Sequence, residues 1–301
     1  MSKCDDPKIR RYCASTFRSM SSKTALCTQM IDMGSLPVLA ELTSTSASIA
    51  KENGNGNGDT SSNTNNTNNT LIAKLIARDC AVAMLNLTRM QGREGNLVED
   101  GAVLAFIGLM NDNEDLAGLC ARALFNLTCV DQPYMFIERV IKSFLGLASA
   151  ATLEVKHICA SALCNLSDLK AMRQKLVEEG VVQVLGLLAR GAEAKTRRIC
   201  AIVLQSLAST KSCRQEMVNK GAVEVMYRLS SDSDSNTLHY IASAMMRLAM
   251  DPANTTRIVN ESGVSALCKI CMRCSDVPRT TQPCAAAFQI LSRQEVSEHR
   301  V

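Results

Sequence analysis

The sequence predicts an all-α protein built from stacked three-helix repeats, and three observations support this prediction. One short phrase recurs along the chain, as CAVAMLNLT ending at Thr88, CARALFNLT at Thr128 and CASALCNLS at Ser167, with weaker copies after them. The copies are about forty residues apart. The composition, with 47% apolar residues, 3% aromatic residues and no Trp, suits a long helical stack. Regular self-similarity indicates one elongated array rather than two globular domains.

The central Asn of each phrase defines a reference column, in which successive members are 40, 39, 41, 41 and 43 residues apart. A seventh copy, CASTFRSMS, puts Ser19 in this column, 67 residues before the next member, which is one period plus an insertion. The insertion, at about 44–70, is Asn- and Gly-rich and almost devoid of apolar residues, so we expect a disordered surface loop. The column consists of Ser19, Asn86, Asn126, Asn165, Ser206, Arg247 and Ile290.

Three helices are expected in each period, most clearly over 169–209. LKAMRQKLVEEG has helical spacing and ends at Gly180, a residue that readily takes the left-handed conformation that stops a helix. VVQVLGLLAR follows as a second helix, and the third runs from about 193 to 208. The third period has Val140 in the glycine position, so an irregular turn is expected there. The other stops are Gly34, Gly101, Gly221 and Gly263.

The repeat boundaries follow from this pattern. A lone third helix at about 6–21 opens the chain within a partial repeat, 1–21, and another third helix ends near Gln294. Cys13, Ala14 and Phe17 of the first helix form a core-type face without a preceding layer, which indicates a longer parent chain or an end-to-end contact with another chain. The expected repeats are 22–89 with the insertion, 90–129, 130–168, 169–209, 210–250 and 251–293, followed by a tail, 294–301.

The third helix of each repeat is expected to bury one wide face. Positions six, five and two residues before the reference column and one after it are apolar in nearly every copy. One repeat cannot bury this face alone, so neighbouring repeats must supply the stability. In two copies these positions are Cys120, Ala121, Leu124 and Leu127, and Cys159, Ala160, Leu163 and Leu166.

The unit resembles the armadillo repeat, whose consensus runs from an acidic helix ending in Glu-Ala-Gly, through a Leu-rich helix, to a third ending in Ala-Leu-x-Asn-Leu. LVEDGAVLAFIGLM followed by LCARALFNLT, at 97–128, matches this consensus nearly throughout, and the resemblance covers about 8–293. It implies a right-handed α-solenoid of the armadillo (ARM) type. Import receptors, adhesion and signalling scaffolds, ubiquitin-ligase appendages and ciliary proteins share this fold, so the fold does not fix the function.

The cysteines are interpreted as core residues rather than ligands. Six of the 14 cysteines occupy one buried repeat column, where neighbouring helices are too far apart for disulfides. Cys268, Cys271 and Cys274 have zinc-like spacing, yet Cys268 and Cys271 align with apolar residues of the preceding repeat. Packing is the preferred interpretation and zinc the alternative, because a closed zinc site needs a fourth ligand. We therefore expect no metal and no cofactor.

Several function classes are disfavoured by composition. The three histidines, the absence of a Gly-rich phosphate loop and the lack of a nucleophile motif predict a protein that is not an enzyme. The net charge of +4, from 33 basic and 29 acidic residues, gives no reason to expect nucleic-acid binding. No apolar run is long enough to span a membrane, and Ser2 replaces the Gly that myristoylation needs, so we expect a cytoplasmic or nuclear protein.

The resemblance implies that the third helices line a concave groove. In several armadillo proteins the Asn of the reference column clamps the backbone of an extended peptide through its amide, and Asn86, Asn126 and Asn165 match it. The alternative is that these amides satisfy backbone groups at the helix ends.

Charged residues near the reference column favour acidic partners. Importin-α-like receptors have Trp four residues before the Asn, where this chain has Arg122 and other residues but no Trp, and Arg122 and Arg247 would repel a basic signal. Eight residues before the column, positive charge recurs, so we hypothesise a basic rim that prefers acidic segments, with a solvated face as the alternative. This rim comprises Arg11, Arg78, His157, Arg198 and His239.

These expectations combine into a non-catalytic scaffold or adaptor that binds extended, acidic protein segments in the solenoid groove. A nuclear-transport adaptor and the substrate-recognition arm of a ubiquitin ligase remain as alternatives.

Overall fold

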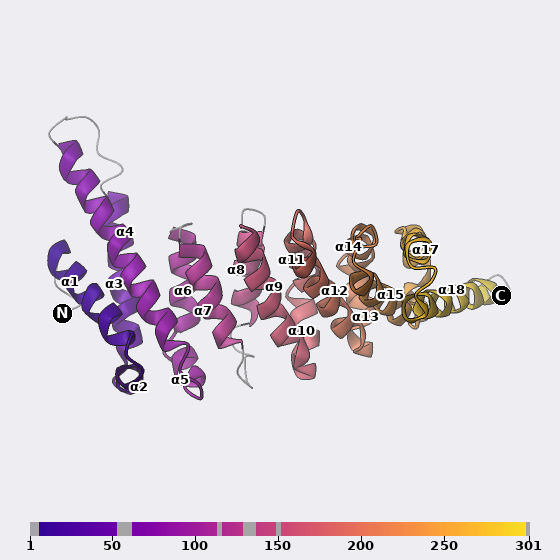
Figure 1. Ribbon diagram of the computed structural model, residues 1–301, viewed down its shortest axis with the longest axis horizontal. Coiled ribbons are helices and arrows are strands. Elements are labelled where there is room, and N and C mark those ends of the chain that lie inside the picture. Colours follow the sequence, from indigo (N-terminus) through magenta and orange to yellow (C-terminus); the bar gives the residue numbers. More distant parts are fainter. Residues whose placement is uncertain (1–5, 53–61, 113–115, 129–136, 149–151, 299–301) are drawn as a thin grey trace. The chain divides into compact units, whose positions relative to one another are not determined.

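The computed structural model describes residues 6–52, 62–112, 116–128, 137–148 and 152–298 (Figure 1). Over these ranges the chain consists of helices and turns, without a strand, which confirms the all-α class. The chain divides into two compact units, 1–132 and 133–301, which we describe separately as unit 1 and unit 2. None of the helices in these ranges combines the length and apolar character needed to cross a membrane.

In unit 1 the third helices of successive repeats stack in chain order. Helix α1 packs along α4, which also contacts α7, while α3 and α6 form the neighbouring layer (Figure 1). Helix α1 lies where the sequence predicts a helix at about 6–21, and the Asp6 carboxylate caps it by accepting a bond of 2.8 Å from the Lys8 N–H. The helices are α1 (Pro7–Ser21), α2 (Thr24–Asp32), α3 (Ser35–Glu52), α4 (Ser62–Leu87), α5 (Glu94–Glu99), α6 (Ala102–Asp112) and α7 (Ala117–Leu127).

Unit 2 repeats the same stacking. Helix α12 packs against both α9 and α15, and α15 packs against α18 (Figure 1). Short 3-10 turns precede the first helix of each of the last three repeats, at Lys170–Met172, Lys211–Cys213 and Pro252–Asn254. The helices are α8 (Ile137–Ala148), α9 (Leu153–Asp168), α10 (Arg173–Glu178), α11 (Val181–Ala189), α12 (Ala194–Ala208), α13 (Arg214–Asn219), α14 (Ala222–Leu229), α15 (Ser235–Ala249), α16 (Thr255–Asn260), α17 (Gly263–Arg273) and α18 (Pro278–Glu298).

The core is built from the predicted face of the third helices. All eight positions named above on α7 and α9 are buried, with at most 1% of their surface exposed. Phe106 of α6 and Phe144 of α8 add the largest buried side chains from the second helices. Each fully buried Leu contributes about 1.5–3 kcal/mol, so stability accumulates layer by layer.

The turn between the first and second helices follows the prediction in four repeats and differs in one. Gly180 has φ +96°, and Gly34, Gly101 and Gly221 are also left-handed. In the last repeat the prediction was wrong by one residue, because Ser262 has φ 70° and Gly263 already begins α17. A Cβ on Gly263 would lie 2.5 Å from the Ile258 carbonyl oxygen, so glycine is needed there for a close approach.

The turn that is expected to be irregular in the third period precedes α8, on residues 129–136, and lies outside the described ranges. Helix α8 passes through Val140 without a break, and this residue is completely buried. A valine side chain can fill the core where a left-handed glycine would have ended the helix, which explains the continuous helix. The expected first helix of this repeat falls largely on residues 129–136, which lie outside the described ranges.

The expected loop at about 44–70 is corrected at both ends. Helix α3 continues to Glu52 and α4 begins at Ser62, so only residues 53–61 of this segment lie outside the described ranges. Adding a residue to an existing helix costs far less than starting one, so the packed parts of α3 and α4 propagate into the polar run. Helix α18 likewise extends to Glu298, into the expected tail.

Candidate functional site on the third helices

The predicted site residues lie on the third helices of both units. Within each unit, we call the surface formed by the reference column, together with the positions four and eight residues before it, the third-helix face of that unit. Asn86, Asn126, Asn165 and Arg247 of the column are half-buried on α4, α7, α9 and α15. The residue after each of them is completely buried, so the column residues stand at the edge of the core. These buried residues are Leu87, Leu127, Leu166 and Leu248.

The amides of unit 1 link consecutive repeats. The Asn86 Nδ2 donates to Ser21 Oγ at 3.2 Å, and the Asn126 Nδ2 donates to Thr88 Oγ1 at 2.9 Å. Ser21 and Thr88 are buried and stand two residues after the column of the preceding repeat. Each hydroxyl in turn donates to the carbonyl oxygen three residues before it. These two bonds go to hydroxyl groups and not to the backbone groups that the alternative names.

This link leaves room for the predicted role in peptide binding. An Asn amide has two N–H donors and a carbonyl oxygen with two lone pairs, and the link uses one donor. The Asn86 Oδ1 also accepts a long bond of 3.5 Å from Arg89. The hydrogen bond to the preceding repeat orients the side chains of Asn86 and Asn126. Clamping of a peptide by Asn86, Asn126 and Asn165 stays a prediction.

Arg198 of the predicted basic rim is paired within the chain. Its guanidinium binds Asp234 through two bonds, Nε to Oδ2 at 2.8 Å and Nη2 to Oδ1 at 3.0 Å. Asp234 also caps α15 by accepting from the Thr237 N–H at 3.0 Å. The Arg198 guanidinium holds the pKa of Asp234 well below its usual range. The positive charge of Arg198 is therefore largely compensated.

The two histidines of the rim also contact the following repeat. His157 Nδ1 lies 3.2 Å from Thr196 Oγ1, and His239 Nδ1 lies 2.9 Å from the Arg279 carbonyl oxygen. A carbonyl oxygen only accepts, so the Nδ1 of His239 carries the proton. Desolvation lowers the pKa of His239, so the neutral ring is favoured at neutral pH. The rim positions of unit 2 thus hold repeats together.

The other predicted arginines differ in their surroundings. Arg78 on α4 and Arg122 on α7 have exposed side chains. The Arg247 Nε is buried without a hydrogen-bond partner within the described part of the chain, although the residue is half-exposed. Exposed basic side chains on the third-helix face of unit 1 are therefore those of Arg11, Arg78 and Arg122.

A second ion pair, between Arg197 and Asp232, lies beside the pair that Arg198 forms with Asp234, and neither pair was predicted from the sequence. The Arg197 Nε lies 2.5 Å from Asp232 Oδ2, and the Asp232 side chain is completely buried. Arg197 also donates to the Ala192 carbonyl oxygen, and Asp232 Oδ1 accepts from the Asp234 N–H at 2.9 Å. The signal was the pairing of Arg197 and Arg198 in one repeat with Asp232 and Asp234 in the next.

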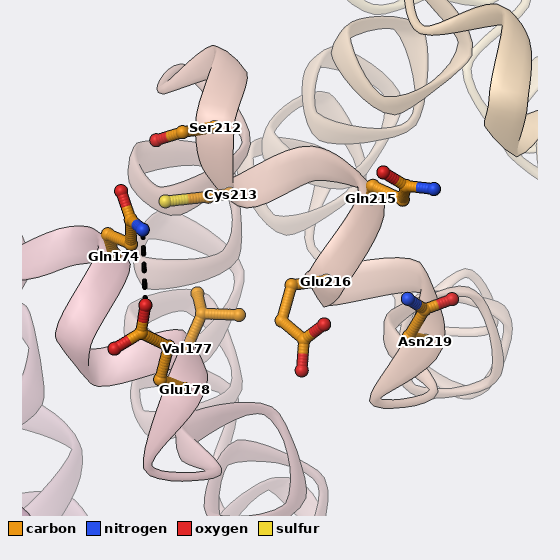
Figure 2. A pocket seen from close by; sticks show the side chains of 8 residues that line it. All are labelled: Gln174, Val177, Glu178, Ser212, Cys213, Gln215, Glu216 and Asn219. Carbon is orange, nitrogen blue, oxygen red and sulfur yellow. Dashed lines mark hydrogen bonds between the residues drawn. The ribbon is translucent and has the colours of Figure 1, made fainter.

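A polar pocket of about 260 Å³ opens between the first helices α10 and α13, away from the third-helix face. Its acidic side chains are Glu178, which accepts from Gln174 at 3.1 Å, and Glu216 (Figure 2). No residue of the predicted site lines it, and its acidic lining differs in sign from the predicted rim. The lining residues are Gln174, Val177, Glu178, Ser212, Cys213, Gln215, Glu216 and Asn219 (Figure 2).

The thiols of the repeat column are inert core groups. Burial raises the pKa of Cys80, Cys120, Cys159 and Cys200 to about 12. None of these four forms a disulfide.

The Cys268, Cys271 and Cys274 triplet is spread over an exposed, a half-buried and a buried position. Helix α18 brings Cys284 to Cys271, and burial together with the neighbouring thiols raises the pKa of Cys284. In the ranges that the structure describes, no three His, Cys, Asp or Glu side chains are grouped to hold a metal ion.

Comparisons with known proteins identify the fold. No described protein family and no curated protein matches the sequence. A computationally designed armadillo repeat protein for modular peptide recognition matches with a TM-score of 0.56 and 18% identity, over 71% of this chain and 93% of that one. A designed armadillo repeat protein in complex with the peptide (KR)4 matches with a TM-score of 0.52 and 16% identity, over 81% and 98%.

A natural armadillo protein matches as well. A structure from work on the interaction between cadherin and β-catenin has a TM-score of 0.62 and 14% identity, covering 96% of this chain and 53% of that one. The chain thus spans about half the length of that protein. The stacked three-helix layers and these likenesses together show that the chain has the armadillo repeat fold.

Proposed function

We propose that the chain is a non-catalytic scaffold or adaptor that binds extended protein segments on its third-helix face. One observation carries the proposal: Asn86 and Asn126 stand half-exposed at equivalent points of consecutive repeats, each oriented by a hydrogen bond to the repeat before it. An extended backbone offers donors and acceptors at regular intervals, which a repeated amide complements because it supplies both. Ordering the amides in advance lowers the entropy cost of binding.

The likeness to solved structures supports this role. The matching structures include a designed armadillo protein in complex with a peptide and a structure from work on the cadherin and β-catenin interaction. A non-enzymatic role in the cytoplasm or nucleus is part of the same proposal.

The proposed ligand is an acidic segment, bound chiefly by unit 1. Arg78 and Arg122 have exposed side chains there, whereas Arg198 and Arg247 of unit 2 are half-buried. Exposed charges raise association rates and are screened by salt, so binding should weaken as ionic strength rises.

The test is fluorescence anisotropy of labelled acidic, neutral and basic extended peptides at low and physiological salt. We expect the acidic peptide to bind tightest, and both Asn126→Ala and the pair Arg78→Glu and Arg122→Glu to weaken it at least tenfold. Lys211→Glu, an exposed charge reversal ahead of α13, is the matched control and should leave binding unchanged. Tight binding of the basic peptide would instead favour a nuclear-transport adaptor.

A further inference from the structure

Helix α1 presents an apolar face that no described part of unit 1 covers. A pocket of about 430 Å³ lies on this face, with Val38 and Leu42 of α3 contributing to its lining. Three large side chains of α1 in this pocket are exposed to solvent: Ile9 by 43%, Tyr12 by 74% and Met20 by 36%.

The repeat pattern shows which kind of element this face accommodates. Counted from the reference column, Phe17 and Met20 of α1 correspond to Met245 and Leu248 of α15. Met245 and Leu248 are completely buried, and α12 of the preceding repeat packs against α15. The face of α1 therefore has the side chains that an internal layer buries against a neighbouring helix, so a helix fits it.

We propose that the face of α1 binds an amphipathic α-helix of a partner protein, with an apolar stripe and acidic residues beside it. Ile9 and Met20 are 11 residues apart, which is about 16 Å along a helix, so the partner helix needs about three turns. Its apolar residues should recur with the i, i+3, i+4, i+7 spacing that buries one face.

The positive charge of α1 is the reason to expect acidic residues beside the apolar stripe of the partner helix. The helix contains Lys8, Arg10, Arg11 and Arg18 and no acidic residue. Arg18 pairs with Asp79 at 2.8 Å, while Lys8 and Arg11 are exposed, and helical spacing puts these two on the side of Tyr12. Acidic residues on the partner would complement this edge. A second copy of the chain pairing through α1 would instead bring the same basic residues together.

The test uses labelled 16-residue helical peptides that share one apolar stripe and carry either Glu or Lys flanks. Anisotropy should show the Glu-flanked peptide binding at least tenfold tighter at low salt. Met20→Glu and Tyr12→Glu should each reduce binding at least tenfold, while Met272→Glu, at an 82% exposed position of α17, should not. Asn126→Ala should leave helix binding intact, which separates this site from the proposed function of the third-helix face.

Two results would overturn the proposal. Equal binding of the Lys-flanked peptide, or full binding by Tyr12→Glu, would show that α1 does not recognise an acidic amphipathic helix. A dimer in light scattering that Met20→Glu dissociates would make a second copy the occupant instead. Tyr12 is 74% exposed, so Tyr12→Glu preserves the fold and decides the question if Met20→Glu does not fold.

Discussion

Helices α1 and α12 share the sequence pattern of the repeat but have different surroundings. Cys13, Phe17 and Met20 of α1 stand at the repeat positions of Cys200, Leu204 and Leu207 of α12. The three α12 residues are completely buried, whereas Met20 is 36% exposed and Cys13 and Phe17 are half-buried. The difference arises from the neighbours: α12 packs against the third helices α9 and α15, whereas α1 packs against one third helix, α4, within the described part of the chain.

This comparison shows that a side chain of a third helix is buried by the neighbouring repeats and not by its own repeat alone. The same side chain is worth several kcal/mol inside the stack and little at its uncovered face. Equivalent substitutions in the two helices should therefore have unequal effects, which can be measured directly.

The largest difference should appear in thiol reactivity. Cys200 is buried and its pKa is raised to about 12, so a thiol reagent reaches it only when unit 2 opens. Cys13 is half-buried and should react at least ~100-fold faster, because opening a packed layer costs several kcal/mol. Timed alkylation followed by mass spectrometry of the peptides checks this; equal rates would mean that α12 opens as readily as α1.

The second largest difference should be in the stability lost when equivalent side chains of α12 and α1 are truncated to alanine. Leu207→Ala should destabilise the protein by about 3 kcal/mol, since it removes a buried side chain and leaves a cavity. Met20→Ala should cost less than about 0.5 kcal/mol at its exposed position. Urea unfolding of both variants gives the comparison, with circular dichroism as a control for helix content. A large cost at Met20 would show that the α1 face is already covered in solution.

The third largest difference should come from removing the ion pair between Arg198 and Asp234, and the loss of stability should depend on pH. Arg198→Gln should lower the stability at neutral pH by removing two charge-assisted bonds to Asp234, whereas the same substitution at the exposed Arg11 of α1, which has the same repeat position, should have almost no effect. The pKa of Asp234 is lowered on folding, so its contribution is complete above the ordinary value of 3.8 and is lost as the pH falls below it.

Melting temperatures from about pH 7 to pH 3 measure this loss. Asp234→Asn should be less stable than the natural chain at neutral pH, and the difference should begin to narrow as the pH falls below 3.8. Parallel pH profiles for the two proteins would contradict the assignment of Asp234.

The smallest effect concerns the reference column. Asn126→Ala should cost about 1 kcal/mol through the lost bond to Thr88, while Ser19→Ala on the exposed surface of α1 should be neutral. Because removing one partner can leave the other unsatisfied, Thr88→Val and the double variant complete a cycle that isolates the pair. No coupling between the two sites would mean that the amide is not oriented by the preceding repeat.

The sequence predicted those features that depend on local periodicity. Cys120, Leu124 and Leu127 recur at fixed offsets, and a helix with that pattern buries the same face wherever its neighbours stand. The left-handed turn at Gly180 was predictable for the same reason.

Features that depend on contacts between repeats were not predicted. The partner of Arg198 lies 36 residues away, at a helix start whose cap positions the Asp234 carboxylate. The length of α4 depends on propagation from its packed half, which a polar composition does not reveal. Whether Asn126 binds a peptide depends on a ligand, so neither periodicity nor packing decides it.

The exchanged turn at Ser262 and Gly263 limits how far the repeats are interchangeable as modules. In most repeats the linker between the first two helices could be transplanted, because its glycine has the same backbone geometry each time. In the last repeat the glycine instead makes room for the Ile258 carbonyl oxygen. A chimaera that takes this linker from an earlier repeat would have to replace the whole segment from Ile258 to Gly263. This segment must therefore be exchanged as one block.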